Sequence, residues 1–227
     1  IIFCDEKHNP FGELSAYYAR HNSTKKIKEQ IQWKKVSKDT LWAKIGENKI
    51  LNQANMLKKT KSSKDTLLLS YLNEIKIGDK TNREGHAAKV YFNELFGKNF
   101  SRSDDNEINA ALNYGYAVLL STINKEIVSN GYLTQLGVHH KNEFNSFNLA
   151  CDIMEPFRIV IDSFVYYNKN RKFDISYKLD IINIFNNTFE YCEKKYILKD
   201  ILKMYVKNTL EAVNNIAKYK GFIYYEE

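Results

Sequence analysis

Proline, glycine and cysteine are all scarce in this sequence. Only 2 of its 227 residues are proline and 9 are glycine. This is too few turn-forming residues for a β-sandwich, so long uninterrupted helices are expected. The three cysteines, Cys4, Cys151 and Cys192, are an odd number and have no CxxC spacing. That pattern argues against a disulfide framework or a zinc site and is typical of a reducing cytoplasm.

Signals for membranes and for several enzyme classes are also missing. No apolar run approaches the roughly 18 residues that a membrane span needs, and residues 1–4 lack the cationic start of a signal peptide. The sequence contains no Walker-type phosphate loop, no GxSxG elbow and no plausible Cys/His nucleophile pair. We therefore expect no membrane association and no chemistry built on those motifs.

The start of the chain suggests that it belongs to a longer protein. It begins with Ile1 rather than Met and opens inside an apolar run, so we expect that an N-terminal part is missing. Residues 1–5 predict the end of a strand, and residues 9–12 predict a turn. We accordingly expect residues 1–22 to be the tail of a separate domain with a linker, and residues 23–227 to form one helical domain.

Apolar residues, in contrast, are plentiful. Hydrophobic residues make up 44% of the chain and aromatic residues 14%, enough for a packed core. Their spacing and the capping residues predict a mainly α fold. The expected helices cover residues 41–57, 65–77, 83–96, about 103–130, 146–167, 177–185 and 198–219, with a short hairpin around 189–196.

Positive charge is concentrated in one block. The net charge is +7, and residues 20–64 hold 13 Lys or Arg against 3 Asp or Glu, a local excess of +10. Such a block suits contacts with DNA phosphates, although a solvated lysine-rich face gives the same pattern. Lys25, Lys26 and Lys28 form its first cluster.

The acids that could carry chemistry lie near a histidine pair. Asp152 and Glu155 are three residues apart, so both project from one helix face, and Arg158 could neutralise one of them. A surface ladder of acids and arginine would look the same. His139 and His140 lie in the preceding loop, where an imidazole could complete a metal site or act as a base, or be an ordinary polar residue.

Glu84 is a third candidate acid. It occupies the first turn of an expected helix, where an acid also opposes the macrodipole, and Gly85 beside it permits close approach of another segment. Two carboxylates and one imidazole would suit a single Mg²⁺ or Mn²⁺ with open positions for phosphate oxygens.

Three segments together resemble one known family, the CRISPR-associated spacer integrase. They are NYGYAVL at residues 113–119, LGVHH at 136–140 and NLACDIMEPFR at 148–158. The last two are specific, because a glycine-led histidine loop that precedes such a helix is hard to produce by chance. Arg83, Glu84 and Gly85 are similar to the family's first metal-binding segment. Residues 4–10 and 144–148 look like the branch found in type II systems. The family's entry helix is similar to a segment that contains Trp42, Ile45, Lys49, Ile50, Asn52 and Gln53.

The resemblance implies which residues form the site. Glu84, His140 and Glu155 would bind Mg²⁺ or Mn²⁺ and act in catalysis, with Asp152 close by. His140 is preferred over His139 by its position in the loop. Further residues expected near the site or on DNA are Asp152, Arg158, His139, Arg83, Lys25, Lys26 and Lys28. The family's N-terminal β-rich domain, which mediates dimerisation, would account for residues 1–22 as its tail.

The implied function is insertion of short foreign DNA fragments into a CRISPR array in the bacterial cytoplasm. The 3′-hydroxyl of a fragment would attack a phosphodiester at the edge of a repeat, and nuclease activity at the same centre is expected. The implied partners are double-stranded fragments with 3′ overhangs, CRISPR repeat DNA, a second copy of the chain and a smaller adaptation protein. In a type II system they extend to the effector nuclease and an accessory adaptation protein.

Two alternatives remain open at this point. One is a non-catalytic helical DNA-binding or scaffold protein, for which the basic block would suffice. It is favoured if the three ligand positions do not converge within a few ångströms. The other is a purely hydrolytic metal-dependent nuclease, which differs only in its nucleophile.

Overall fold

The computed structural model describes residues 2–4, 10–14, 22–78 and 82–224. The fold is mainly helical, as predicted, with two small antiparallel sheets. The strands are β1 (Ile2–Cys4), β2 (Pro10–Glu13), β3 (Thr188–Tyr191) and β4 (Lys194–Ile197). The helices are α1 (Ser23–Ile31), α2 (Lys35–Lys59), α3 (Asp65–Leu72), α4 (Arg83–Phe96), α5 (Glu107–Ser129), α6 (Asn148–Met154), α7 (Arg158–Tyr167), α8 (Ile175–Ile184) and α9 (Leu198–Ala212). Two 3₁₀ turns, η1 (Glu155–Phe157) and η2 (Ile216–Lys218), complete the described elements.

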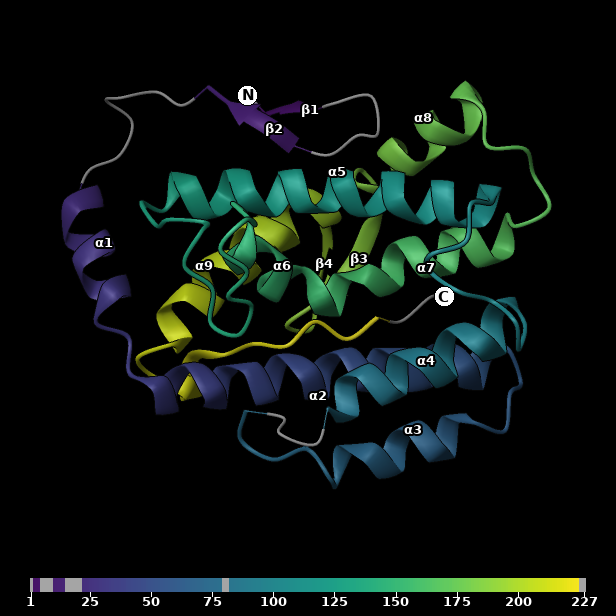
Figure 1. Cartoon of the computed structure of the whole chain (residues 1–227), viewed down its shortest axis with the longest axis horizontal. Helices are drawn as coiled ribbons and strands as arrows, with labels where there is room; N and C mark the ends of the chain where they lie inside the picture. The colour runs from purple at the N-terminus through teal and green to yellow at the C-terminus, as the bar shows by residue number, and fades with distance from the viewer. Residues whose placement is uncertain (1, 5–9, 15–21, 79–81, 225–227) are drawn as a thin grey trace.

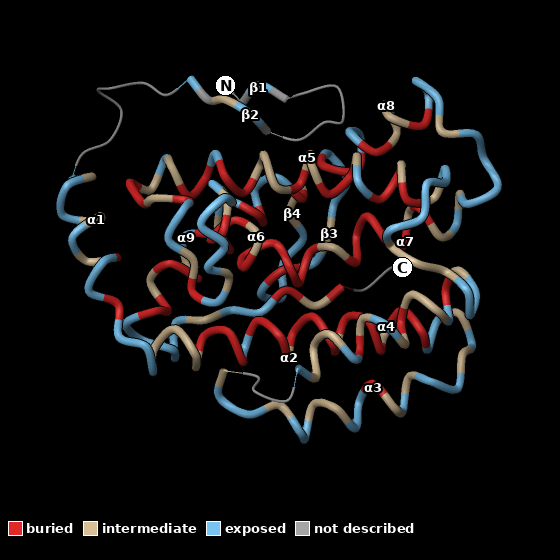
Figure 2. The backbone as a smooth tube through the Cα atoms, viewed as in Figure 1, coloured by how far each residue is buried: buried red, intermediate tan, exposed pale blue. Residues whose placement is uncertain are grey.

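Two long helices organise the core. α5 packs against α6, α7 and α9, while α2 carries α3 and α4 and also contacts η1 (Figure 1). The C-terminal segment runs between these two groups, and the inner faces of α2, α5 and α7 are buried (Figure 2). No helix in the described part of the chain is long and apolar enough to cross a membrane.

The C-terminal segment is tied to α2 by two buried asparagines. Asn48 both donates to and accepts from the backbone of Phe222, at 2.8 Å in each case. Asn52 donates to the carbonyls of Phe222, at 2.8 Å, and Pro156, at 2.9 Å. Because one α2 side chain binds both segments, η1 is held at a fixed position against the middle of α2.

Glycine permits the close approach of α5 and α7. A Cβ added to Gly115 would lie 2.4 Å from Cγ2 of Ile161, far inside van der Waals contact. The glycine of the NYGYAVL segment is therefore needed for packing at the centre of the core.

Several boundary predictions were wrong, and each has a local reason. The single helix predicted over 146–167 is split into α6, η1 and α7, since Pro156 lacks the N–H that a continuous helix needs. The predicted turn at 9–12 is instead largely β2, which pairs with β1; Asn9 lies outside the described residues. The helices predicted to end at 77 and 219 end at Leu72 and Ala212.

Two further boundaries are set by features that the predictions overlooked. α5 begins at Glu107 rather than near Ser103, because Asn106 caps it by accepting from the Asn109 amide at 2.8 Å. α1, within the basic block, was not predicted. The hairpin predicted near 189–196 is confirmed as β3–β4. Its two loop residues, Cys192 and Glu193, have positive φ, as a two-residue hairpin turn requires.

Candidate metal and DNA-binding site

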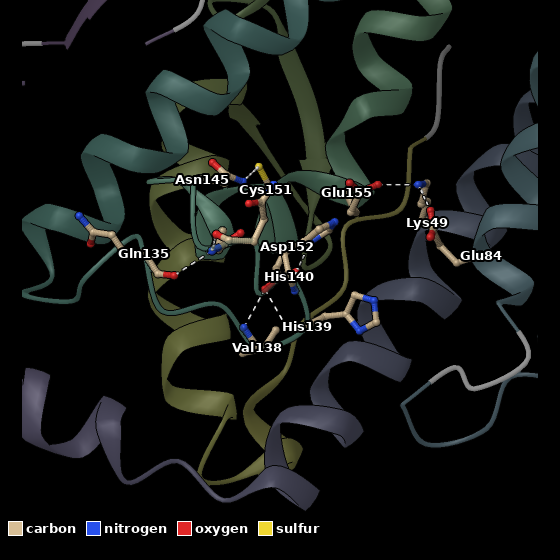
Figure 3. Close-up of polar contacts among 12 residues, drawn as sticks. Lys49, Glu84, Gln135, Val138, His139, His140, Asn145, Cys151, Asp152 and Glu155 are labelled. Atoms are coloured by element: carbon tan, nitrogen blue, oxygen red, sulfur yellow. Dashed lines mark hydrogen bonds and ion pairs between the residues drawn. The ribbon is translucent and has the colours of Figure 1, made fainter. Parts of the chain in front are cut away.

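Lys49 lies between two of the three predicted metal ligands. Its ammonium donates to Oε2 of Glu155 at 2.5 Å and also to Oε1 of Glu84 (Figure 3). The three side chains come from the middle of α2, the first turn of α4 and the start of η1. Lys49 and Glu155 are both buried. The two carboxylates therefore share one cation in the interior of the protein.

Glu155 is paired with a second cation as well. Nε of Arg158 donates to Oε1 of Glu155 at 3.0 Å, which confirms the pairing expected from their spacing. Burial alone would raise the pKa of Glu155, but Arg158 and Lys49 outweigh it and lower that pKa to about 2. Burial likewise disfavours the charged form of Lys49, yet Glu155 and Glu84 raise its pKa. Glu155, Arg158 and Lys49 are therefore all charged at neutral pH.

Asp152 organises the histidine loop through hydrogen bonds from its carboxylate. Its Oδ2 accepts from the backbone amides of Val138, at 2.7 Å, and His139, at 3.0 Å. Its Oδ1 accepts from the His140 amide at 3.1 Å and contacts the ring Nδ1 at 2.5 Å. The carboxylate is completely buried, so this single acid holds three consecutive residues of the loop.

The same contact orients the His140 ring. With Nδ1 bound to Asp152, only Nε2 remains to bind a ligand, an arrangement that is typical of metal-ligating histidines. The hydrogen bond to Asp152 raises the pKa of His140 in spite of partial burial. Gly137 makes the arrangement possible, because a Cβ there would lie 2.7 Å from Oδ2 of Asp152.

The two adjacent histidines have different surroundings. The His139 ring stacks on Trp42 of α2, with centroids 4.1 Å apart and planes 3° apart. The His140 ring meets Trp42 edge-on at 5.8 Å. Stacking supports a packing contact for His139, whereas His140 has the hydrogen-bonded orientation of a ligand.

The structure does not bring all three predicted ligands into one cluster, which is the arrangement that favours the alternative of a non-catalytic DNA-binding or scaffold protein. Among the described residues, no three His, Cys, Asp or Glu side chains are grouped so that they could hold a metal ion. Glu84 and Glu155 converge on Lys49, while His140 pairs with Asp152. The chemistry of the donors nevertheless fits a hard divalent cation, since two carboxylates already share one positive charge and a nearby imidazole has one nitrogen left.

The remaining predicted residues have partners outside the Lys49 cluster or are exposed. Arg83 pairs with Glu74 at 2.7 Å and lies over the Tyr71 ring. Lys25 and Lys28 are exposed on α1, at the edge of the molecule (Figure 1). Lys26 is partly buried; it pairs with Glu29 at 3.2 Å and lies 5.5 Å from the Tyr132 ring.

A pocket opens beside His140. Its volume is about 550 Å³, and it places both aromatic and cationic groups next to the histidine loop. Lys38 and Lys141 contribute positive charge there, and Trp33 a buried ring. Glu143 also lines the pocket and offsets one of these two positive charges. The pocket has room for a nucleotide, and its two lysines suit the phosphate.

Lys49 is the site residue whose role the sequence analysis missed. A signal was available, because Ile45, Lys49 and Gln53 follow helical spacing and all three are buried. A lysine on the apolar face of a helix needs a partner in the core. Its two partners lie 35 and 106 residues away in the sequence, so the sequence alone could not identify them.

Comparisons with known proteins agree on one family. A family profile described as "CRISPR associated protein Cas1" matches residues 1–177. The CRISPR-associated endonuclease Cas1 of Neisseria meningitidis serogroup C (strain 8013) is 40% identical over 163 residues, which cover 71% of this chain and 54% of that protein. The chain thus spans about half the length of this relative.

Two solved structures have a similar fold. A Cas6-RT-Cas1–Cas2 complex aligns with a TM-score of 0.76 at 20% identity and covers 99% of this chain and 30% of that one. A casposase bound to an integration product aligns with a TM-score of 0.75 at 19% identity and covers 99% of this chain and 78% of that one. At such identities the likeness concerns the fold.

Proposed function

Because this chain belongs to the CRISPR-associated Cas1 family, we propose that it carries the metal-dependent centre of an enzyme that integrates short DNA fragments into a CRISPR array. The observation that carries this proposal is the pairing of Glu84 and Glu155 around one cation, beside an imidazole oriented by buried Asp152. Two acids from separate elements share a site only where a cation joins them; Lys49 is that cation here, and a divalent ion would satisfy the same two carboxylates. The type II branch, suggested by residues 4–10 and 144–148, is part of the same proposal.

The proposed reaction is a phosphodiester exchange. The 3′-hydroxyl of the fragment forms a bond to phosphorus at the repeat edge, and the bond from that phosphorus to the 3′-oxygen of the adjoining strand breaks. The attacking hydroxyl loses a proton and the leaving oxygen gains one. Because one phosphodiester bond replaces another, no energy source is required. A Mg²⁺ or Mn²⁺ ion held by Glu84, Glu155 and His140 would polarise the phosphate and stabilise the charge that develops on it.

The protein's own groups would prepare this step. Asp152 fixes the orientation of the His140 ring, and Arg158 holds the Glu155 carboxylate in position. The pocket beside His140 offers a place for a terminal nucleotide. The exposed lysines of α1 would contact phosphates farther along the duplex.

The assembly is also a proposal. We infer that the complete protein forms a homodimer and joins a smaller second adaptation protein, because two integration sites require two hydroxyls delivered at a fixed separation. A chain of similar fold occurs in a Cas6-RT-Cas1–Cas2 complex. The Cas2 component of that complex supports a second adaptation protein as the partner of this chain. Sedimentation of the complete protein as a strict monomer, with and without DNA, would contradict this proposal.

The direct test replaces Glu155. Glu155→Gln keeps the side-chain shape but removes the negative charge, so strand transfer of a labelled fragment should fall at least about 100-fold while DNA affinity stays within about threefold. Glu193→Gln, in the exposed loop of the β3–β4 hairpin, is the matched control and should retain activity. Near-normal strand transfer by folded Glu155→Gln would contradict the site assignment.

The same assay separates the alternatives. A scaffold protein would bind the DNA but yield neither joined nor cleaved product with any divalent metal. A purely hydrolytic nuclease would release shortened strands without joining them. Products that contain the fragment covalently linked to the repeat strand support the integrase.

A further inference from the structure

Lys49 occupies the position where the two carboxylates meet. Its ammonium nitrogen is 2.5 Å from Oε2 of Glu155 and in contact with Oε1 of Glu84. Mg²⁺ and Ca²⁺ bind carboxylate oxygens at about 2.0 to 2.6 Å. An ion bound between these two acids would therefore overlap the ammonium group, and both cannot occupy the position together.

The charges of this cluster already balance. Glu84 and Glu155 contribute two negative charges, and Lys49 and Arg158 contribute two positive ones. A divalent ion would add two further positive charges beside an ammonium group in a buried site, where charges are weakly screened. The cost of this repulsion falls only if the ammonium moves away.

The lysine side chain can make such a move. It has a flexible four-carbon stem and a compact charged head, whereas Arg158 is held by Glu155 and lies 4.5 Å from the Tyr116 ring. Lys49 is thus the cation of the pair that an incoming ion would displace.

We propose that Lys49 is a built-in counter-cation that competes with the divalent metal for Glu84 and Glu155. Without metal it keeps the two acids together; on metal binding its ammonium leaves their shared position and stays nearby as an additional positive charge. The excess charge is then neutralised by a phosphate of the DNA, so DNA and metal bind cooperatively. This inference rests on the proposed metal site, and it adds that Lys49 is a positioning residue which lowers metal affinity in the absence of DNA.

Removing the charge of Lys49 tests the idea. Lys49→Met keeps an unbranched stem of similar length but cannot pair with the acids. Without metal this variant should melt at a lower temperature, because the buried Glu155 and the partly buried Glu84 lose the cation that they share. In calorimetric titrations of the DNA-free protein, it should bind Mn²⁺ about tenfold more tightly than the wild type, and Mn²⁺ should raise its melting temperature more.

Controls separate competition from a purely structural role. Lys44 lies on the same helix and pairs with Glu47 at 2.7 Å in a half-exposed position. Lys44→Met is therefore the matched control and should leave Mn²⁺ affinity unchanged. A structural role alone predicts that Lys49→Met binds Mn²⁺ more weakly. Equal or weaker Mn²⁺ binding by folded Lys49→Met would overturn the proposal.

A second variant pair protects the test against misfolding. Lys49→Met combined with Glu84→Gln removes the lysine together with one of its acids and leaves Glu155 paired with Arg158. This double variant should bind Mn²⁺ more tightly than Glu84→Gln alone; equal or weaker binding would again overturn the proposal.

If wild-type protein shows neither Mn²⁺ binding nor metal-dependent strand transfer, the proposed function fails as well. If wild-type activity depends on Mn²⁺ but these variants gain no affinity, the counter-cation proposal alone fails.

Discussion

Asp152 binds His140 twice, through the backbone amide at 3.1 Å and through ring Nδ1 at 2.5 Å. The same carboxylate accepts from the amides of Val138 and His139. A buried carboxylate with this many donors is a structural anchor, because it accepts charge-assisted hydrogen bonds from several backbone amides at once. Asp152 therefore acts on the proposed chemistry through His140.

Replacing this anchor should affect both stability and activity. Asp152→Asn places an amide group among backbone N–H donors, so at least one buried donor loses its acceptor. We expect the free energy of unfolding to fall by about 2 to 4 kcal/mol, measured by urea denaturation, and strand transfer to fall with it. Asp180→Asn, whose ion pair with Arg171 is exposed, should change stability by less than about 1 kcal/mol. Equal effects of the two substitutions would refute the anchoring role.

The packing of α5 against α7 makes a second prediction. Gly115→Ala would place its Cβ 2.4 Å from Ile161, and overpacking of this kind costs about 1 to 3 kcal/mol. The loss should shrink when Ile161→Ala is introduced as well, which a double-mutant cycle in urea would measure. Gly46→Ala in α2 is the matched control: nothing lies within 4 Å of its Cβ, so it should be neutral or stabilise by up to about 1 kcal/mol.

Local patterns explain what the sequence could predict. α4 was predicted at its observed bounds, because Asn82 and Gly97 flank an apolar repeat. The ion pair of Glu155 and Arg158 followed from their three-residue spacing. The break at η1 was missed although Pro156 was visible, since the apolar stripe continues through it. The Lys49 bridge and the stack of Trp42 on His139 were not predictable, because both join residues that only the tertiary fold brings together.

Asp162 predicts a dependence of stability on pH. Burial raises its pKa from 3.8 to about 6, although the Tyr116 hydroxyl that donates to it opposes the shift. Because the folded protein holds this proton more tightly than the unfolded chain, the contribution of Asp162 to stability is greatest below pH 3.8. It is lost as the pH rises through about 6.

The substitution Asp162→Asn should remove this dependence. The variant should gain stability relative to the wild type as the pH rises from about 4 to 7, by up to about 3 kcal/mol. Urea denaturation of both proteins across this range measures the difference, in which groups common to both cancel. A difference that is constant with pH would mean that Asp162 keeps an ordinary pKa.

The exposed lysines of α1 make a prediction about DNA. Lys25→Glu with Lys28→Glu should weaken binding to duplex DNA and reduce the slope of log affinity against log salt by up to about 2, since fewer counterions are released. Reversing Lys26 as well should add a loss of stability, because Lys26 pairs with Glu29. Lys169→Glu with Lys172→Glu changes the charge equally in an exposed loop and should alter the slope less. Equal slopes for wild type and the α1 variant would reduce this cluster to a solvated face.

The histidine pair provides the most selective test of the proposed metal site. His140→Ala removes the imidazole that Asp152 orients, so strand transfer should be lost in Mg²⁺ and recover at most slightly in millimolar Mn²⁺, which binds nitrogen ligands more readily. His139→Ala loses the stack on Trp42, worth about 0.5 to 1.5 kcal/mol, and the edge contact with the His140 ring. It should nevertheless retain most activity in either metal. Thermal melting of both variants would show that each is folded. An inactive His139→Ala beside an active His140→Ala would move the ligand by one residue, and two active variants would place the metal site elsewhere in the protein.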